Sequence, residues 1–378
     1  MLGQYRDGIV IRFCRLLLLL AFVVTILFVM IANHPRSISA QSPTKLWSVD
    51  LSKDKDFRAR LKFQEVMLYT PSLNFLNNSQ IICDFFSTAK DGTGEISTTM
   101  GYHVLEIDAH TGTLGRKLEF KALENNYKAL PVADGGFIVF ADDQLKKYNN
   151  HFMLGPSYST PRVQGGEYFD RWLVDIAPSG QTVLLYSHRP GETQGRWTWL
   201  RTTDLTTVTS MQAPTARIIR ASDVAGIFDG IDDRELLFGG KTTVLCTRCN
   251  VHFLTENLLF LDKQQSYAIQ TITGKEQGAG KLDVQALNFS RSAQATRVAY
   301  VTGHYVGSGS LIQTNFESIT GKIIVLDWNA NKSVAAIEMN EPTGNPSAGL
   351  TQMALALSPN GEYLAVLLHH TLSLYRLP

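Results

Sequence analysis

The sequence predicts an all-β fold: a single β-propeller of six blades behind an apolar N-terminal helix. Three observations support this prediction. Residues beyond 45 carry almost no helical periodicity, their short apolar runs are bounded by turn residues, and similar strand–turn units recur along the chain. Apolar runs rich in Val, Ile, Leu, Tyr and Thr between Gly, Asn, Asp and Pro are typical of strands joined by tight turns. The composition, 44% hydrophobic and 18% charged, is that of a globular chain.

Residues 1–40 hold the strongest local signal. An apolar run without charge, residues 16–32, follows three arginines. This arrangement matches both a cleaved signal peptide and a retained membrane anchor, because both combine a basic flank with an apolar run. The bond between Ala40 and Gln41 is the candidate cleavage site. Either route predicts that residues 41–378 form the propeller domain outside the cytoplasm, periplasmic or extracellular, secreted or anchored by the N-terminal helix.

A strand–turn–strand unit recurs in the body of the chain. The segments LVDIAPSGQTVLLYS and LALSPNGEYLAVLL share an apolar strand, a turn with Pro two residues before Gly, and a second apolar strand. Proline fixes one turn residue and glycine tolerates positive φ at another, so the unit predicts a compact strand reversal.

A second recurring unit is an apolar strand that ends in Asp before a polar turn, and it predicts the number of blades. The six marker positions are Asp108, Tyr148, Asp204, Asp262, Asp327 and Tyr375, of which the two tyrosines keep the rhythm without the Asp. Spacings of 40 to 65 residues between markers in an all-β chain indicate propeller blades. Six blades are therefore expected. Seven remain open because residues 216–261 are crowded with short runs, and a pair of β-sandwiches is the alternative fold.

The two ends of the domain are predicted to close the propeller ring. Residues 45–51, KLWSVDL, form a short alternating strand with no partner nearby, and the sequence ends on a third strand, TLSLYRL. Because an open sheet edge favours aggregation, we expect the N-terminal strand to complete the last blade. Trp47 and Val49 would then pair with the strand that contains Leu372 and Leu374.

Through SPNGEYLAV, APSGQTVLL and the Asp-ended strands, the chain resembles the WD40-like and YVTN-like β-propeller superfamily, including its exported bacterial members. The resemblance extends over most of residues 45–378 and implies the fold. Intracellular WD40 repeats carry Gly-His and Trp-Asp pairs in register, whereas here Gly303-His304 occurs once and Asp327-Trp328 is reversed. The resemblance therefore implies no binding residues.

Cys246 and Cys249, in the segment CTRC, are the candidate disulfide. Asn250 follows the second cysteine, so the pair does not form a c-type haem site. With His252 the pair supplies at most three zinc ligands, one fewer than a structural zinc site uses. A functional thiol pair, metal binding, unpaired cysteines and pairing with Cys83 remain alternatives. No cofactor and no metal site is expected.

Other candidate features have ordinary structural explanations. Trp197 and Trp199 alternate along one strand, which favours packing between blades over a ligand platform. The carboxylates of residues 229–235 lack the ligand order of an EF-hand and are expected in a solvated turn. His369 and His370 follow a strand of the last blade, where an exposed histidine is the default interpretation.

The expected function follows from what the sequence carries and lacks. No Lys/Arg cluster marks a nucleic-acid partner, and no G-x-S-x-G motif marks a hydrolase, so the catalytic residues stay unknown. We expect a monomeric exported module that binds a protein or cell-surface ligand of unknown identity and meets a membrane only through an uncleaved N-terminal segment. The alternative is a propeller enzyme, a hydrolase, lactonase or oxidoreductase, with its site in the central channel. The residues favour the binding module and leave the enzyme open.

Overall fold

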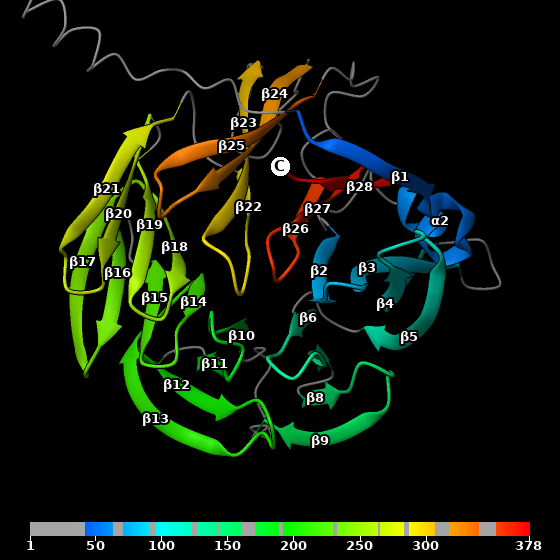
Figure 1. The fold of residues 1–378 in the computed structure, drawn as a ribbon. Coiled ribbons are helices and arrows are strands. Elements are labelled where there is room, and N and C mark those ends of the chain that lie inside the picture. The colour runs from blue at the N-terminus through cyan, green and yellow to red at the C-terminus, as the bar shows by residue number, and fades with distance from the viewer. Residues whose placement is uncertain are drawn as a thin grey trace, which may run out of the picture. The chain divides into compact units, whose positions relative to one another are not determined.

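The chain folds as a ring of β-sheets around a central axis (Figure 1). The computed structural model describes residues 42–62, 71–90, 96–122, 127–141, 144–160, 171–188, 192–229, 233–263, 265–282, 287–306, 318–339 and 353–378. The expected N-terminal helix and the candidate cleavage site at Ala40 and Gln41 lie outside these residues, so the signal peptide and the anchor stay predictions. No helix among the described residues is both long and apolar enough to span a membrane.

The described strands form seven four-stranded antiparallel sheets, the blades of a single β-propeller. Blade 1 contains β2 (Ser72–Asn77), β3 (Gln80–Lys90), β4 (Ile96–Asp108) and β5 (Leu114–Ala122). Blade 2 contains β6 (Lys128–Pro131), β7 (Phe137–Ala141), β8 (Gln144–Tyr148) and β9 (Leu154–Ser159). Blade 3 contains β10 (Arg171–Ile176), β11 (Thr182–His188), β12 (Gln194–Arg201) and β13 (Thr207–Pro214). Blade 4 contains β14 (Ile219–Ala221), β15 (Ala225–Asp229), β16 (Asp233–Phe238) and β17 (Lys241–Thr247).

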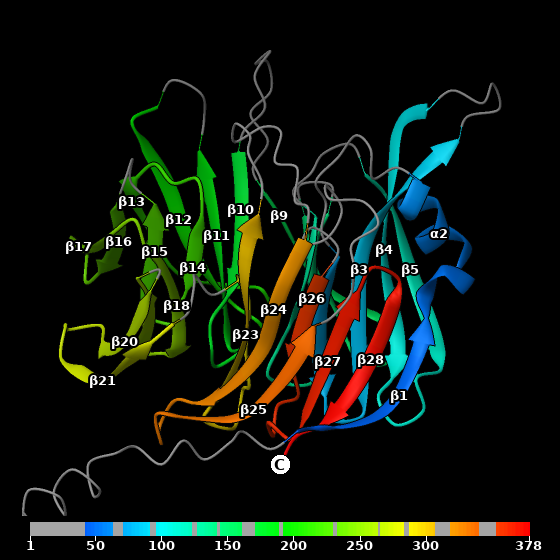
Figure 2. The same cartoon turned by 90° about the horizontal axis from the view of Figure 1, so that it is seen from above.

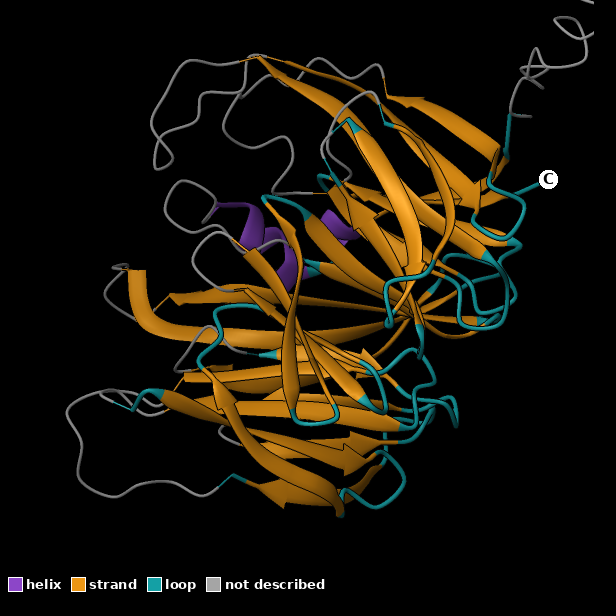
Figure 3. Cartoon of the chain, turned by 90° about the vertical axis from the view of Figure 1, so that its left-hand side faces the viewer, coloured by secondary structure: helices purple, strands orange, loops and turns teal. Residues whose placement is uncertain are grey.

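The remaining blades complete the ring. Blade 5 contains β18 (Asn250–Thr255), β19 (Leu258–Asp262), β20 (Ser266–Thr271) and β21 (Glu276–Lys281). Blade 6 contains β22 (Leu287–Arg291), β23 (Arg297–Val306), β24 (Ser318–Asp327) and β25 (Lys332–Met339). Blade 7 contains β26 (Met353–Leu357), β27 (Tyr363–Leu368), β28 (Thr371–Arg376) and, as its outer strand, β1 (Thr44–Asp50). Figure 3 shows how strongly strands dominate the described chain.

The prediction of six blades is wrong, and the seven that the sequence left open are present, because the third strand of blade 4 does not end in the Asp on which the count depended. Asp108 and Asp327 end the third strands of their blades, but Asp262 ends β19, a second strand. In blade 4 the Asp stands at the end of the second strand, as Asp229 of β15, and the third strand β16 turns into β17 through Gly239 and Gly240, which both have positive φ. Where an Asp does end the third strand, its carboxylate accepts backbone N–H groups of the turn, as Asp108 Oδ1 does from residues 110 and 111. The glycine pair makes its turn without that carboxylate, so the crowded segment 216–261 contains all of blade 4 and the start of blade 5.

The first and last strands of the propeller pair with each other (Figure 2). Trp47 lies opposite Leu374 and Val49 opposite Leu372 in the antiparallel ladder between β1 and β28. Trp47 Nε1 then donates to the carbonyl of Ala109 in blade 1, at 2.9 Å. The N-terminal strand therefore completes blade 7 and also fastens it to blade 1.

A short helical segment after β1 fills the junction between blades 7 and 1. The 3-10 turn η1 (Leu51–Lys53) leads into α2 (Lys55–Lys62), whose first turn is capped by Asp54 Oδ1 accepting from residues 56 and 57. Lys117 Nζ lies 2.8 Å from Asp54 Oδ2 and holds this cap against β5. Phe57 is fully buried and packs edge-on against Phe85, with 5.0 Å between ring centroids.

The core of the protein consists of seven apolar layers, each between two neighbouring blades. Trp197 and Trp199 belong to the layer between blades 3 and 4, and both are almost completely buried. Trp199 Nε1 donates to the carbonyl of Ser222 in blade 4 at 2.9 Å. Buried side chains cannot form a ligand platform, so these tryptophans serve blade packing.

Candidate functional site

The first strands of all seven blades surround a central cavity of about 810 Å³. These inner strands are β2, β6, β10, β14, β18, β22 and β26. Side chains of a strand point to the two faces of its sheet, so here they point toward the neighbouring blades, and the free backbone edge faces the channel. The volume lies within the range of about 300–1,000 Å³ typical of ligand pockets.

Side chains of one blade bond to the exposed backbone edge of the next. Asp84 Oδ2 in blade 1 accepts from Ala129 N in blade 2, at 3.3 Å. Asp175 Oδ2 in blade 3 accepts from Ala221 N in blade 4, at 3.0 Å. Ser290 in blade 6 accepts from the backbone N–H of residue 357 in blade 7, at 3.0 Å. These bonds satisfy donors that an inner edge strand would otherwise leave unpaired.

Asp84 is buried on β3, next to the inner strand β2, and has further partners. Ser72 donates to its Oδ1, and the Tyr102 hydroxyl donates to its Oδ2 at 2.7 Å. Burial raises the pKa of Asp84 above its usual value, while these hydrogen bonds oppose the rise. Burial and the neighbouring Asp84 carboxylate raise the pKa of Tyr102 in turn. The group therefore forms a satisfied polar network between blades 1 and 2.

Asp175 lines the channel and bonds to two other blades. Its Oδ1 lies 3.3 Å from Lys128 Nζ on the inner strand of blade 2, while its Oδ2 holds Ala221 N of blade 4. A single side chain of blade 3 thus connects the blades on both of its sides. The ion pair is partly shielded from water, with 15% of the Asp175 side chain exposed.

At one end of the channel, the turns between the first and second strands of several blades meet. Arg291 of blade 6 donates from Nη1 to the carbonyl of Pro178 in blade 3, at 3.1 Å. Glu256 of blade 5 accepts from Ser179 N at 2.6 Å and from Asp223 N at 2.5 Å, in blades 3 and 4. We call these five residues the turn clasp.

The turn clasp contains two partly buried charged side chains, Glu256 and Arg291. Burial raises the pKa of Glu256, with the two backbone hydrogen bonds opposing the rise and the neighbouring Asp223 adding to it. Burial lowers the pKa of Arg291, while Asp175 and Glu256 counter that effect. The opposite charges and the hydrogen bonds thus offset part of the cost of burying these two groups.

Three nitrogen-containing side chains of blades 4 and 5 line the same cavity. They are Arg220 on β14, Arg234 on β16 and His252 on β18. All three side chains are half-buried. Arg220 Nη1 donates to the carbonyl of Ile219 at 2.8 Å. His252 stacks on Phe289 of blade 6, with ring centroids 4.0 Å apart and an angle of 14° between the planes. Burial and, to a lesser extent, Arg220 lower the pKa of His252 well below its usual value, so the imidazole is neutral at neutral pH.

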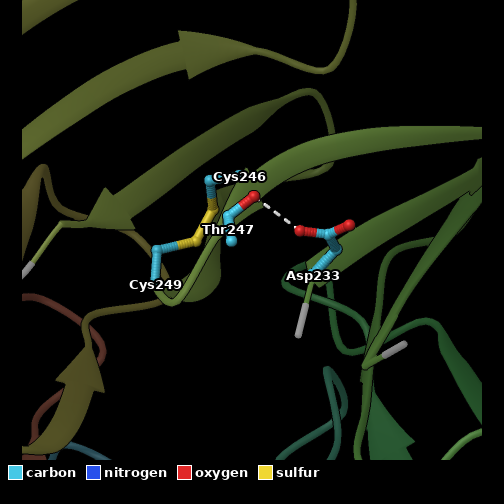
Figure 4. Close-up of a disulfide and its surroundings, with 4 residues drawn as sticks. All are labelled: Asp233, Cys246, Thr247 and Cys249. Carbon is cyan, nitrogen blue, oxygen red and sulfur yellow. Dashed lines mark hydrogen bonds between the residues drawn. A yellow bond between two sulfur atoms is a disulfide. The ribbon is translucent and has the colours of Figure 1, made fainter. Parts of the chain in front are cut away.

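The candidate disulfide residues lie between blades 4 and 5, whereas Cys83 lies in blade 1. A disulfide joins Cys246 at the end of β17 to Cys249 just before β18 (Figure 4). Beside it, the Thr247 hydroxyl donates to Asp233 Oδ1 at 2.5 Å. The structure thus shows the pair bonded across the link between two blades, and Cys83 buried in β3.

The other candidates from the sequence are not brought together. His369 has positive φ in the turn between β27 and β28, and His370 Nε2 lies 4.0 Å from Asp50 Oδ1 at the edge of blade 7. Of the carboxylates at 229–235, Asp229 lines the channel, while residues 230–232 lie outside the described part of the chain. Within the described residues, no group of three or more His, Cys, Asp or Glu side chains is placed to hold a metal ion.

Comparisons with known proteins place the chain at the level of its fold. No protein-family model and no curated protein matches the sequence. The crystal structure of BBS1N in complex with ARL6DN, soaked with lead, is similar with a TM-score of 0.50 and 10% identity, over 90% of this chain and 98% of that one. The crystal structure of Chaetomium thermophilum Raptor is similar with a TM-score of 0.54 and 12% identity, over 82% of this chain and 28% of that one. At these identities the likeness shows the fold alone, and the chain is a β-propeller.

Proposed function

We propose that this propeller is a binding module for a protein partner. The observation that supports the proposal is the use made of three carboxylates that lie on the inner strands or next to them. Asp84, Asp175 and Glu256 each accept a hydrogen bond from the backbone of another blade. They connect blades, and they stay engaged as long as the propeller ring stays closed.

A catalytic carboxylate needs a different arrangement. A general base must reach the proton of its substrate, and a metal ligand must turn a lone pair to the ion. Turning Asp175 or Glu256 away would leave a partly buried N–H donor unpaired, at a cost of at most about 1–3 kcal/mol for each donor. Because of this cost, the carboxylates suit a structural role better than a catalytic one. A ring held together in this way is rigid and can present a surface to a partner.

The choice of a protein as the ligand has support by analogy. BBS1N, a similar fold, was crystallised in complex with ARL6DN. We propose that this chain likewise binds a protein, as a monomer, and that it does so outside the cytoplasm because of the basic and apolar pattern in residues 1–40.

The test is to capture the partner with the full chain carrying a C-terminal affinity tag. Intact cells are cross-linked, the envelope fraction is solubilised, and the captured proteins are identified by mass spectrometry. The matched control is Trp199→Ala, which opens the layer between blades 3 and 4 and reports proteins that adhere to a damaged fold. The proposal expects a partner that the native chain enriches over the control and that binds it in a defined ratio after purification. Repeated failure to find such a partner would contradict it.

A propeller enzyme is the second candidate, favoured by His252 in a cavity of about 810 Å³. Its ring nitrogens have no hydrogen-bond partner among the described residues, so the imidazole is open to a substrate in the pocket. The purified chain is assayed on ester, lactone and oxidisable alcohol substrates. Turnover that His252→Ala abolishes, with the fold retained, would favour this candidate over the binding module.

A further inference from the structure

The channel contains a basic site that binding of a protein partner does not explain. We propose that Arg220, Arg234 and His252 bind an oxyanion, the carboxylate or phosphate group of a small ligand, inside the channel. Arg220 and Arg234 share the face of blade 4 that packs on blade 5, whereas His252 lies on the face of β18 toward blade 6, and all three border one cavity. This proposal is independent of the protein partner, because small anions alone test it.

The two arginines keep most of their hydrogen-bonding capacity. Arg220 donates to the Ile219 carbonyl, and for Arg234 the described part of the chain offers no hydrogen-bond or ion-pair partner. A guanidinium has five donors in a planar fork that matches the oxygens of a carboxylate or phosphate. The donors that these two arginines retain thus suit an oxyanion.

Asp229 lies directly across the strand pair from Arg234 but is used elsewhere. Its Oδ1 accepts from Arg217 N at 2.8 Å and from Ile218 N at 2.6 Å, at the point where the chain enters β14. The carboxylate therefore anchors the backbone of blade 4.

The other charges along the cavity are balanced. Lys128 pairs with Asp175, and Arg291 faces both Asp175 and Glu256. Among the described residues that line the cavity, Arg220 and Arg234 remain against the single carboxylate of Asp229. In a partly enclosed site the lower effective dielectric strengthens the attraction of this excess positive charge for an anion.

His252 adds a donor held in a fixed orientation. Its stack on Phe289 fixes the plane of the imidazole, and its ring nitrogens have no hydrogen-bond partner in the described parts of the chain. Asn250, which also lines the cavity, lies on the same face of β18 and brings an amide. Two positive charges from blade 4 and these neutral polar groups from blade 5 thus border the same cavity, a combination that suits an oxyanion.

The size of the space favours a small ligand. The cavity of about 810 Å³ lies within the range of small-molecule sites. The turn clasp crosses the channel at one end, where Arg291 of β22 reaches Pro178 after β10. A compact di- or tricarboxylate, or a phosphorylated small molecule, suits this volume better than a long chain.

Isothermal titration calorimetry of the full chain at constant ionic strength tests the proposal. Citrate and inorganic phosphate are titrated in separate arms, with glycerol as the neutral control. We expect saturable binding of at least one anion, and the tighter arm distinguishes carboxylate from phosphate. The absence of saturable binding for both anions at millimolar concentration would overturn the proposal.

Variants locate the bound anion. Arg220→Gln and Arg234→Gln should each weaken binding at least tenfold, and His252→Gln should weaken it less. Lys241→Gln is the matched control, because Lys241 is an exposed cation of the same blade and lies outside the cavity. If a Gln variant changes the circular dichroism spectrum, Arg234→Lys replaces it, and the loss of the fork alone should still reduce affinity. Equal weakening by Lys241→Gln would show diffuse surface charge and would refute the site.

Discussion

Replacing Trp47 tests whether the N-terminal strand closes the propeller ring. Trp47 lies on the outer strand of blade 7, yet its indole N–H bonds to Ala109 of blade 1 at 2.9 Å. Its ring also lies against Gly112, where a Cβ would come within 3.0 Å of the indole. The side chain therefore belongs to the contact between the last blade and the first, and its removal should weaken the whole domain.

The expected cost follows from these contacts. Fully burying a tryptophan removes roughly 150–250 Å² from water. Trp47 is partly buried, so about 100 Å² at about 25 cal/mol/Å² gives about 2.5 kcal/mol. The lost hydrogen bond adds about 1 kcal/mol. Trp47→Ala should thus lower the free energy of unfolding by about 3–4 kcal/mol, and Trp47→Phe, which keeps an aromatic ring, by about 1 kcal/mol.

Urea unfolding followed by far-UV circular dichroism measures these differences. The matched control is Leu46→Ala on the same strand, where 47% of the side chain is exposed and the change should stay within about 0.5 kcal/mol. The transition of each variant should remain single, because the strand connects both ends of the domain. If Trp47→Ala unfolded at the same urea concentration as Leu46→Ala, the reasoning on ring closure would be wrong.

Three further changes have defined outcomes. Gly226→Ala places a Cβ 2.6 Å from the Trp197 ring and should cost about 1–3 kcal/mol in urea unfolding; a neutral result would mean that the layer between blades 3 and 4 yields easily. His103 is 1% exposed, and burial lowers its pKa in the folded protein. The unfolded chain therefore takes up a proton more readily than the folded one as the pH falls below about 6.5, and the free energy of unfolding decreases. His103→Gln should reduce the loss of urea midpoint between pH 7 and pH 5, and an equal loss in both proteins would exclude this histidine as its source. Double replacement of Cys246 and Cys249 by Ser should lower the melting temperature modestly, since the bond closes a very short loop, and a protein that no longer folded would contradict that expectation.

Local sequence was sufficient for the turns and for the closing strand. Gly180 and Gly361 in the two Pro-x-Gly turns both have positive φ, the conformation for which glycine is needed. Gly180 also leaves no room for a side chain, since a Cβ would lie 2.7 Å from Ala133 N. The alternating pattern of residues 45–51 located β1, because a strand with one apolar face needs a partner and a core whatever its distance along the chain. The number of blades could not be predicted from local sequence in this way, because the Gly239-Gly240 turn carries no Asp.

The channel could not be predicted in this way, because its contacts join residues far apart in the sequence. Arg291 and Pro178 are separated by 113 positions, and Glu256 and Ser179 by 77. No spacing rule connects such pairs before the blades are placed. A usable signal does exist: a charged residue or histidine inside a short apolar run, as in RWLVDIA and NVHFL, breaks the pattern of a buried strand. Such a residue on the first strand of a blade is a candidate for the channel.

A channel residue that stabilises the ring and one that binds a ligand differ in where their hydrogen-bond partners lie. A polar group that stabilises the ring must find its partner inside the protein, as Asp175 does with Lys128 and a backbone N–H of blade 4. Its removal should lower stability, since the backbone N–H of Ala221, a residue 2% exposed, is left without its bond. A polar group that serves a ligand keeps its donors available, as Arg234 does, and its removal should leave stability nearly unchanged while affinity decreases. Stability and anion affinity should therefore be measured on both variants. Asp175→Asn should mainly lower stability, whereas Arg234→Gln should mainly lower anion affinity.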